Sequence, residues 1–347
     1  MAQQRRALAL ISGGLDSLLA AKVVQEQGVH VEGINFYTGF CVEGHTHAIR
    51  EKDRKRVKRN NALWVAEQLG IKLHIVDIVD EYKQVVFNPQ YGYGANLNPC
   101  LDCKIFMVRK AREWIDEQGF DFVITGEVVG QRPKSQRSET MPVVQHDSGI
   151  EDRLLRPLCA KKLPATLPER EGWVERERLF DFSGRGRKPQ IALAAQYGFK
   201  DYAQPAGGCC FLTDRSYSLR LRDLWAARGE RQYELDDIML LKVGRHVRPA
   251  PHFKVIMARE EGEGNFLSGY RKQYPSLKTV SHGGPFALLD GEPTLADTEL
   301  AARIMARYGQ GRHADRVTFE YRSAQGEVSE LRVVPLDPNE IPSDWLI

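Results

Sequence analysis

Two groups of residues in this chain combine types and spacing that could carry chemistry. The first is Ser12-Gly13-Gly14-Leu15-Asp16-Ser17, which follows a short apolar run and precedes a helical pattern. Glycines let backbone N–H groups approach an anion closely, and the N-terminus of a helix adds a favourable dipole. The hydroxyls of Ser12 and Ser17 can hydrogen-bond phosphate oxygens. The sequence therefore predicts a phosphate-binding loop, against the simpler alternative of a glycine turn with a polar helix cap.

The second group consists of cysteines. Cys100 and Cys103 form a C-x-x-C pair before a helical pattern, and Cys209 and Cys210 are adjacent. A secreted disulfide protein rarely uses such spacings, and we recognise no export signal, so a reducing cytoplasm is expected. Clustered cysteines there indicate metal or redox chemistry. At a helix N-terminus the dipole would stabilise a thiolate.

Cys41 and Cys159 have no partner in the sequence. We expect them to be inert structural cysteines.

The elements that must position these residues alternate between strand and helix. Strands are expected at 7–11, 29–36, 73–79 and 122–125, and helices at 16–27, 50–68, 103–118 and 191–197. This order predicts an α/β fold with a doubly wound parallel sheet over residues 1–230. Residues 163–189 mix Pro and Gly with charges and predict irregular structure. Strands at 255–258, 287–289, 317–321 and 328–333 and a helix at 296–308 predict a smaller α+β domain at 231–347.

Composition excludes several classes of protein. The 347 residues are 42% hydrophobic and 27% charged, with a formal net charge of +3. No apolar run approaches the roughly 18 residues that a membrane helix needs, so no membrane partner is expected.

Basic residues gather at 50–59, 132–137 and 185–188, where they could make salt-dependent contacts with phosphates or remain solvated.

The phosphate loop lacks both the Gly-Lys-Ser/Thr ending of a Walker A loop and the G-x-G-x-x-G of a dinucleotide fold. It instead resembles the PP-loop of the ATP pyrophosphatase family. Thr125-Gly126-Glu127-Val128-Val129-Gly130-Gln131 and Arg156-Pro157-Leu158 resemble the branch that thiolates RNA, seen in 4-thiouridine and 2-thiouridine synthetases. The resemblance implies ATP and Mg²⁺, with Asp16 positioning magnesium or pyrophosphate. The implied nucleotide-binding residues are Ser12, Gly13, Gly14, Asp16, Ser17, Phe36, Gly126 and Gln131.

The cysteines extend this resemblance. Asn98-Pro99-Cys100-Leu101-Asp102-Cys103 and Cys210-Phe211 resemble the N-P-x-x-x-C and C-F motifs of 2-thiouridylases. This places Cys103 and Cys210, with Asp16, in the catalytic role, and Cys100 adds the pattern of iron–sulfur-dependent thiolases. Three interpretations stay open: a [4Fe–4S] cluster on Cys100, Cys103 and Cys210, a persulfide on Cys210 resolved by Cys103, or a structural zinc site. Cys209 could replace Cys210 as the third ligand.

The resemblance implies an ATP-dependent tRNA uridine thiolase. The enzyme would adenylate a uracil carbonyl and then replace its oxygen with sulfur. We expect 4-thiouridine as the product, with 2-thiouridine at the wobble position as the alternative. A PP-loop synthetase acting on a small acid and a non-catalytic RNA-binding factor are the rival hypotheses.

The implied partners are tRNA and a sulfur donor, either sulfide or a cysteine desulfurase, and the sequence leaves a homodimer open. Residues 242–248 and 281–285 resemble the NFACT-R type of RNA-binding domain.

Overall fold

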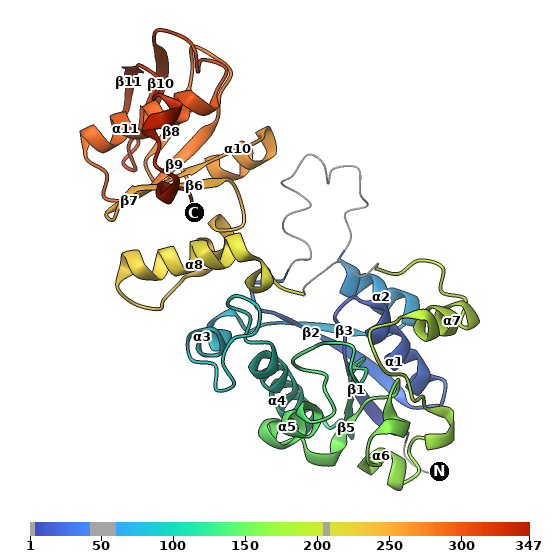
Figure 1. The fold of residues 1–347 in the computed structure, drawn as a ribbon. Helices are drawn as coiled ribbons and strands as arrows, with labels where there is room; N and C mark the ends of the chain where they lie inside the picture. The colour runs from blue at the N-terminus through green and yellow to red at the C-terminus, as the bar shows by residue number, and fades with distance from the viewer. Residues whose placement is uncertain (1–3, 42–59, 204–208) are drawn as a thin grey trace. The chain divides into compact units, whose positions relative to one another are not determined.

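The computed structural model describes residues 4–41, 60–203 and 209–347 (Figure 1). These residues form two compact units. The first contains 4–41, 60–203 and 209–213, and the second begins at Asp214. The domain boundary expected at residue 230 therefore lies within the second unit. No helix in the described part of the chain is long and apolar enough to cross a membrane.

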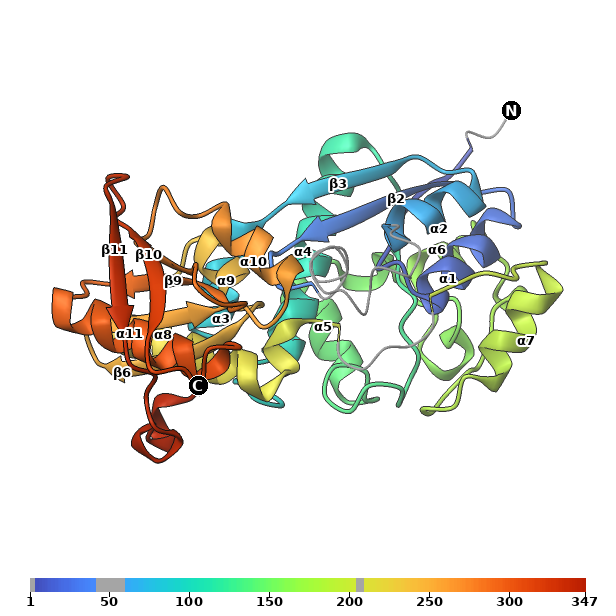
Figure 2. The ribbon, with the colours of Figure 1, turned by 90° about the horizontal axis from the view of Figure 1, so that it is seen from above.

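The first unit is built on five parallel strands in the order β3-β2-β1-β4-β5. The strands are β1 (Arg6–Leu10), β2 (His30–Tyr37), β3 (Leu73–Asp77), β4 (Phe122–Ile124) and β5 (Leu154–Leu155). Figure 2 shows β2 and β3 running side by side in the same direction. The chain order reverses at β1, which pairs with β2 on one side and with β4 on the other. In doubly wound sheets, ligands bind beyond the carboxyl ends of the strands at such a reversal.

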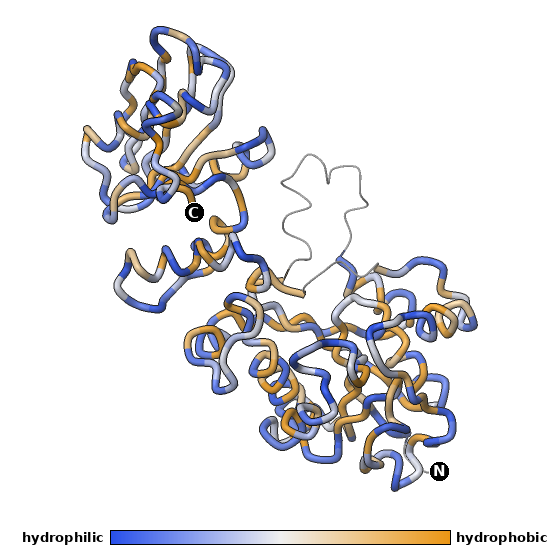
Figure 3. The backbone as a smooth tube through the Cα atoms, viewed as in Figure 1, coloured by the Kyte–Doolittle hydropathy of each residue, from blue (hydrophilic) through white to orange (hydrophobic). Residues whose placement is uncertain are grey.

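Helices cover both faces of this sheet, which confirms the predicted doubly wound architecture. α1 (Leu15–Gln25), α2 (Asn61–Leu69) and α7 (Lys188–Gln196) contribute to one core, whereas α4 (Cys100–Gln118) and α5 (Thr140–Ser148) contribute to the other. β1 serves both cores, because Ala7 and Ala9 face one side and Leu8 faces the other. A strand buried on both faces reads as a continuous apolar run rather than an alternating one. Figure 3 shows hydrophobic segments gathered along these strands.

Local sequence features determine where the helices α2 and α4 begin. The side chain of Asn60 caps α2 by accepting from the backbone N–H groups of Ala62 and Leu63. α4 begins at Cys100, one turn before the expected start, so both cysteines of the C-x-x-C pair lie in its first turn. The first half of the helix expected at 50–68 lies outside the described residues. α3 (Val79–Phe87) and α5 were not predicted.

Residues 163–189 are irregular, as expected. Apart from the first two residues of α7, they contain α6 (Leu167–Arg170) and the 3₁₀ turn Arg176–Arg178. The remaining 3₁₀ turns are Glu151–Arg153, Ala160–Lys162, Phe211–Thr213, Pro338–Glu340 and Ser343–Trp345.

The second unit is the expected smaller α+β domain, with an antiparallel sheet in the order β11-β10-β8-β9-β7-β6. Its elements are α8 (Arg215–Arg228), α9 (Leu235–Leu240), β6 (Arg245–Ala250), β7 (Phe253–Met257), α10 (Glu261–Ser268), β8 (Ser276–Thr279), β9 (Phe286–Gly291), α11 (Leu295–Tyr308), β10 (Val317–Arg322) and β11 (Val328–Val333). The sequence predicted four of these strands but missed β6 and β8. β6 mixes two arginines, a histidine and a proline, and β8 is only four residues long.

Candidate functional site

The phosphate loop connects β1 to α1 at the reversal point of the sheet. Gly13 has a positive φ of 79°, and a Cβ atom there would lie 2.7 Å from Cβ of Asn61. The Ser17 hydroxyl donates to the carbonyl of Gly14 at 2.8 Å, and the Ser12 and Ser17 hydroxyls are 3.4 Å apart. The loop thus has the backbone path that only glycine tolerates at residue 13.

Asp16 lies in the first turn of α1 and is held by two other segments. Gln131 donates to its Oδ2 at 2.7 Å, and the Arg187 guanidinium is 3.3 Å from the same oxygen. The other oxygen, Oδ1, is buried and has no hydrogen-bond partner in the described structure. A buried acceptor without a partner is costly, so it suits a magnesium ion or a ligand donor.

The loop after β4 lies directly against the phosphate loop. A Cβ atom on Gly126 would lie 2.4 Å from the backbone carbon of Asp16 and 2.6 Å from the backbone nitrogen of Ser17. Gln190 on α7 donates to Oε1 of Gln131 at 3.2 Å, and its own Oε1 is buried without a partner. The structure therefore brings Ser12 to Ser17, Gly126 and Gln131 together at one edge of the sheet.

Phe36 is placed differently from these residues. It is 7% exposed and belongs to the core on the α4 side of the sheet, together with Ile34 and Ile105. α1, which begins at the phosphate loop, packs on the opposite side. A contact between Phe36 and the nucleotide stays a prediction.

Glu127 links the two halves of the site. It is 2% exposed and accepts hydrogen bonds from Arg156 at 3.1 Å and from the Thr125 hydroxyl at 3.0 Å, while Lys104 is 3.8 Å away. Burial by itself would raise the pKa of Glu127, but Lys104 and Arg156 hold the pKa below its usual value. Because Lys104 follows Cys103 and Glu127 follows Gly126, this buried carboxylate joins the cysteine helix to the loop beside Asp16.

The C-x-x-C cysteines differ from the expected thiolates. The Cys100 thiol donates to the Ser135 hydroxyl at 3.2 Å. Burial, with added repulsion from Cys209, raises the pKa of Cys103 to about 12, although the Tyr82 hydroxyl donates to this sulfur. The expectation that the helix N-terminus makes Cys103 a thiolate is therefore wrong, because removal from water outweighs the dipole.

Cys209 is the thiolate that the sequence did not single out. Its side chain is exposed, and the Cys210 thiol, Arg132 and Lys104 lower its pKa to about 5. The pKa of Cys210 is raised, because Cys209 takes the negative charge of the pair and Cys210 is buried. The sequence did not reveal that Arg132 lies near Cys209, because the two residues are far apart along the chain. Gly207 and Gly208, which precede Cys209 in the sequence, lie outside the described residues.

Several cysteines meet around Tyr82 on α3. Its pKa is raised by burial and by the neighbouring thiols of Cys103, Cys210 and Cys209. Cys210 also lies 3.7 Å from Oδ1 of Asn98, and its backbone forms a bridge with that of Cys41. The structure thus gathers the C-x-x-C helix and the adjacent pair into one thiol neighbourhood.

This neighbourhood does not have the geometry of a metal site. In the described part of the chain, no three His, Cys, Asp or Glu side chains lie close enough to hold a metal ion. The described residues therefore do not support the predicted [4Fe–4S] cluster on Cys100, Cys103 and Cys210, and we derive no step through one.

The two remaining cysteines have different settings. Cys159 is fully buried and donates to the Glu127 carbonyl at 3.2 Å, and burial raises its pKa to about 11, as expected of a structural cysteine. Cys41 was expected to be equally remote, yet its backbone bridge places it beside Cys210. Its sulfur lies 3.7 Å from the Thr38 hydroxyl.

The basic clusters are only partly available to RNA. Lys134 donates to the carbonyls of Tyr91 and Gly92, and Arg137 donates to the Pro133 carbonyl. Arg187 is paired with Asp16. Arg185 and Lys188 are exposed, and the cluster at 50–59 lies outside the described residues.

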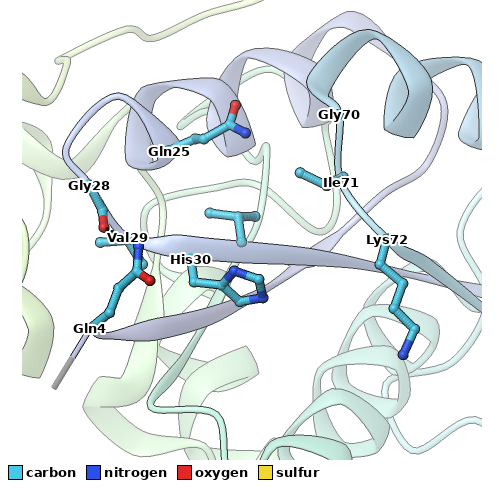
Figure 4. A pocket seen from close by; sticks show the side chains of 9 residues that line it. Gln4, Gln25, Gly28, Val29, His30, Gly70, Ile71 and Lys72 are labelled. Atoms are coloured by element: carbon cyan, nitrogen blue, oxygen red, sulfur yellow. Dashed lines mark hydrogen bonds between the residues drawn. The ribbon is translucent and has the colours of Figure 1, made fainter.

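A separate pocket of about 290 Å³ lies at the opposite edge of the sheet, where β2 begins (Figure 4). Its lining includes His30, Gln25 and Lys72. His30 and His74 flank the carboxylate of Glu32, whose pKa they lower to about 2 against the opposing effect of burial. Ligands of doubly wound sheets bind at the other edge, so we assign this pocket no role.

Comparison with known proteins agrees with this geometry. Residues 5–148 match the family model of the tRNA methyl transferase HUP domain, and residues 244–346 match that of the NFACT protein RNA binding domain. The tRNA-specific 2-thiouridylase MnmA 3 of Phocaeicola vulgatus is 33% identical over 36% of this chain and 33% of its own length. The tRNA-specific 2-thiouridylase MnmA of Pseudomonas putida is 27% identical over 70% of this chain and 60% of its own length.

This chain therefore spans between a third and 60% of the length of these two relatives. A solved 4-thiouridine synthetase–RNA complex with bound ATP has a TM-score of 0.37 at 20% identity, covering 61% of this chain and 46% of that one. A likeness this weak carries no argument. The chain is therefore similar to tRNA-specific 2-thiouridylases, and its residues 244–346 are similar to an RNA-binding domain of NFACT proteins.

Proposed function

We propose that this protein is an ATP-dependent tRNA uridine thiolase. The observation that carries the proposal is the buried Glu127, which joins a glycine-rich anion loop to a cluster of thiols. Thiolation of a uracil carbonyl needs both parts, because oxygen leaves the ring only after it has been activated. The relatives named 2-thiouridylases support the same chemistry.

The phosphate loop would serve the first step. Backbone N–H groups of Gly13 and Gly14 and the hydroxyls of Ser12 and Ser17 would hold the ATP phosphates. The uracil oxygen would attack the α-phosphorus, so that pyrophosphate leaves and an adenylated uridine remains. Asp16 would hold magnesium through the oxygen that lacks a partner, in the orientation fixed by Gln131 and Arg187.

The thiols would serve the second step. A thiolate of the cluster would take sulfane sulfur from the persulfide of a cysteine desulfurase, whose own thiolate leaves. The resulting persulfide would attack the activated ring carbon, and AMP would leave. A second thiolate would then attack the S–S bond of this adduct, so that the sulfur stays on the ring and the two enzyme cysteines form a disulfide that an added thiol reduces. The exposed Cys209 thiolate is the group prepared to take sulfur from a donor, because only the thiolate form is nucleophilic. Cys210 would share this role as its neighbour. Cys103 would need to lose its proton before it could resolve a disulfide.

The proposal has two further details: which ring carbon of the uridine receives the sulfur, and how the sulfur reaches it. The sequence favours 4-thiouridine, whereas the names of the relatives favour 2-thiouridine. A persulfide route agrees better with the described thiols than the cluster does. Iron and sulfide analysis after anaerobic purification tests the cluster directly. About four iron and four sulfide ions per chain would support the cluster route instead.

The proposal is tested by nucleoside mass spectrometry of tRNA treated with the full chain, ATP, a cysteine desulfurase with cysteine as the sulfur donor, and a thiol reductant. We expect a thiouridine whose mass and retention distinguish the 2-thio from the 4-thio isomer. D16N should abolish the product, whereas D181N, at an exposed aspartate outside the site, should not. Pyrophosphate release that never depends on RNA would refute tRNA as the substrate and favour a small-acid synthetase.

A further inference from the structure

Cys41 and Cys210 pair across two segments of the first unit that are far apart along the chain. They form an isolated antiparallel bridge. The backbone N–H of Phe211, which follows Cys210, donates to the carbonyl of Phe40, which precedes Cys41, at 2.9 Å. A hydrogen bond between the residues that flank a bridge, rather than between its two members, defines a non-hydrogen-bonded pair. Cys41 and Cys210 therefore form the closer of the two kinds of antiparallel pair.

This pairing brings the two thiols within reach of a disulfide. Across a non-hydrogen-bonded pair the Cα atoms lie about 4.5 Å apart, and both side chains leave the same face of the ladder. Disulfides join Cα atoms that are about 4.4–6.8 Å apart, so the pair falls within that range. Both cysteines are free and partly exposed. A disulfide can therefore form between Cys41 and Cys210 by rotation of their side chains.

The bridge also lies at the edge of the sheet where the phosphate loop begins. Cys41 follows the carboxyl end of β2, and the phosphate loop follows the carboxyl end of β1. The two strands are parallel neighbours, so both ends reach the same edge. Near this edge the Asn35 amide of β2 donates to the carbonyl of Ile11, directly before the loop, at 2.7 Å. A uridine activated at the loop would therefore be on the same edge as Cys41.

Two other thiols near Cys210 are less suited to form a disulfide with it. Cys209 is its neighbour in the chain, and consecutive Cα atoms lie about 3.8 Å apart, below the usual range for a disulfide. Burial and repulsion from Cys209 raise the pKa of Cys103 to about 12. Only the thiolate form attacks a disulfide, so Cys103 is a poor attacking group at neutral pH.

We propose that Cys41 is the resolving cysteine of the thiolation reaction, whose thiolate attacks the sulfur of Cys210 and releases the thiouridine. The inference rests on the proposed function, because it names the second thiolate that this function requires. Cys210 would receive the sulfur from Cys209 by exchange: its thiolate attacks the outer sulfur of the Cys209 persulfide, and the Cys209 thiolate leaves.

The resolving step balances without an external oxidant. In the adduct, Sγ of Cys210 is bonded to the sulfur on the ring carbon. The thiol of Cys41 loses its proton to solvent, and the resulting thiolate attacks this Sγ. The bond to the ring sulfur breaks, and its electron pair stays on that sulfur. The two cysteines are thereby oxidised to a disulfide, while the sulfane sulfur is reduced to the thiocarbonyl of the product.

The test is a single turnover of the full chain without free thiol. The protein is loaded with sulfur by a cysteine desulfurase and cysteine, desalted, and then mixed with ATP and tRNA. We expect thiouridine in the tRNA and a Cys41–Cys210 disulfide in non-reducing peptide mass spectrometry. C41S should instead hold the tRNA as a covalent adduct, seen as a slower band in a non-reducing denaturing gel. Dithiothreitol should release thiouridine from this adduct, because an external thiol replaces the missing thiolate.

C159S is the matched control. Cys159 is a buried cysteine that the reaction does not use, and a serine hydroxyl can still donate to the Glu127 carbonyl. This variant should release thiouridine and form the disulfide as the unchanged protein does. Thermal melting would check that each variant is folded.

Two outcomes would overturn the inference while leaving the thiolase in place. One is a Cys103–Cys210 disulfide after the turnover, and the other is thiouridine released by C41S without any thiol. The proposed function fails in a different way. An unchanged protein that makes no thiouridine even with dithiothreitol would refute the thiolase, and the resolving role of Cys41 would be refuted with it.

Discussion

Gly126 provides the sharpest test of how the two loops cooperate. A methyl group at residue 126 would lie 2.4 Å and 2.5 Å from the carbonyl carbon and oxygen of Asp16 and 2.6 Å from the backbone nitrogen of Ser17. All three contacts are backbone atoms in the first turn of α1, so no flexible side chain can move aside. Relief to an ordinary contact of about 3.4 Å requires a displacement of about 1 Å.

That displacement has a calculable consequence. A misplacement of about 1 Å at a site of this kind can cost about 100-fold in rate. Overpacking of a closely packed region also costs typically 1–3 kcal/mol of stability. We therefore expect G126A to lower ATP-dependent pyrophosphate release about 100-fold and to lower the free energy of unfolding by about 1–3 kcal/mol.

The assays are pyrophosphate release with tRNA and ATP and chemical denaturation. The matched control is G186A, because a Cβ atom on Gly186 meets nothing within 4 Å and its backbone is not left-handed. This control should retain activity and stability. Activity of G126A within twofold of the unchanged protein would refute the close contact between the loops and its role in placing Asp16.

Three further predictions concern Glu127 and the thiols. R156M should lower the free energy of unfolding by about 3–5 kcal/mol, because it removes the arginine that is hydrogen-bonded to the buried carboxylate of Glu127. Urea denaturation would measure this loss, and a loss below about 1 kcal/mol would contradict the prediction. Since the pKa of Glu127 is lower in the folded protein, its contribution to stability should be complete above the unfolded value near 4.3 and should decrease as pH falls through the folded value. E127Q should therefore weaken the decrease of unfolding free energy at acid pH. A decrease as steep as that of the unchanged protein would contradict this prediction. Iodoacetamide should label Cys209 already at pH 6 and Cys103 only in strongly alkaline solution, as peptide mass spectrometry can show; early labelling of Cys103 would reverse the assignment of the thiolate.

The contrast between Cys103 and Cys209 shows where reasoning from the sequence reached its limit. The start of the helix at Cys100 was nearly readable from the local pattern, and with it the dipole that favours a thiolate. The pKa of Cys103 is raised by burial and by repulsion from Cys209, which is more than a hundred residues away. A hydrogen bond from Tyr82, on a helix that the sequence did not reveal, opposes this rise. Desolvation is a property of the assembled surroundings, so it could not be predicted from a motif.

The sequence by itself determined the features that depend on neighbouring residues. The phosphate loop required glycine at residue 13, where the backbone has a positive φ, and the apolar run at 7–10 required a strand buried on both faces. The tertiary structure alone decided which distant groups meet Asp16. Gln131 follows β4 and Arg187 precedes α7, and both reach one carboxylate because β1 and β4 are neighbours in the sheet. Strand order is set by the packing of two cores, a long-range balance that local patterns do not encode.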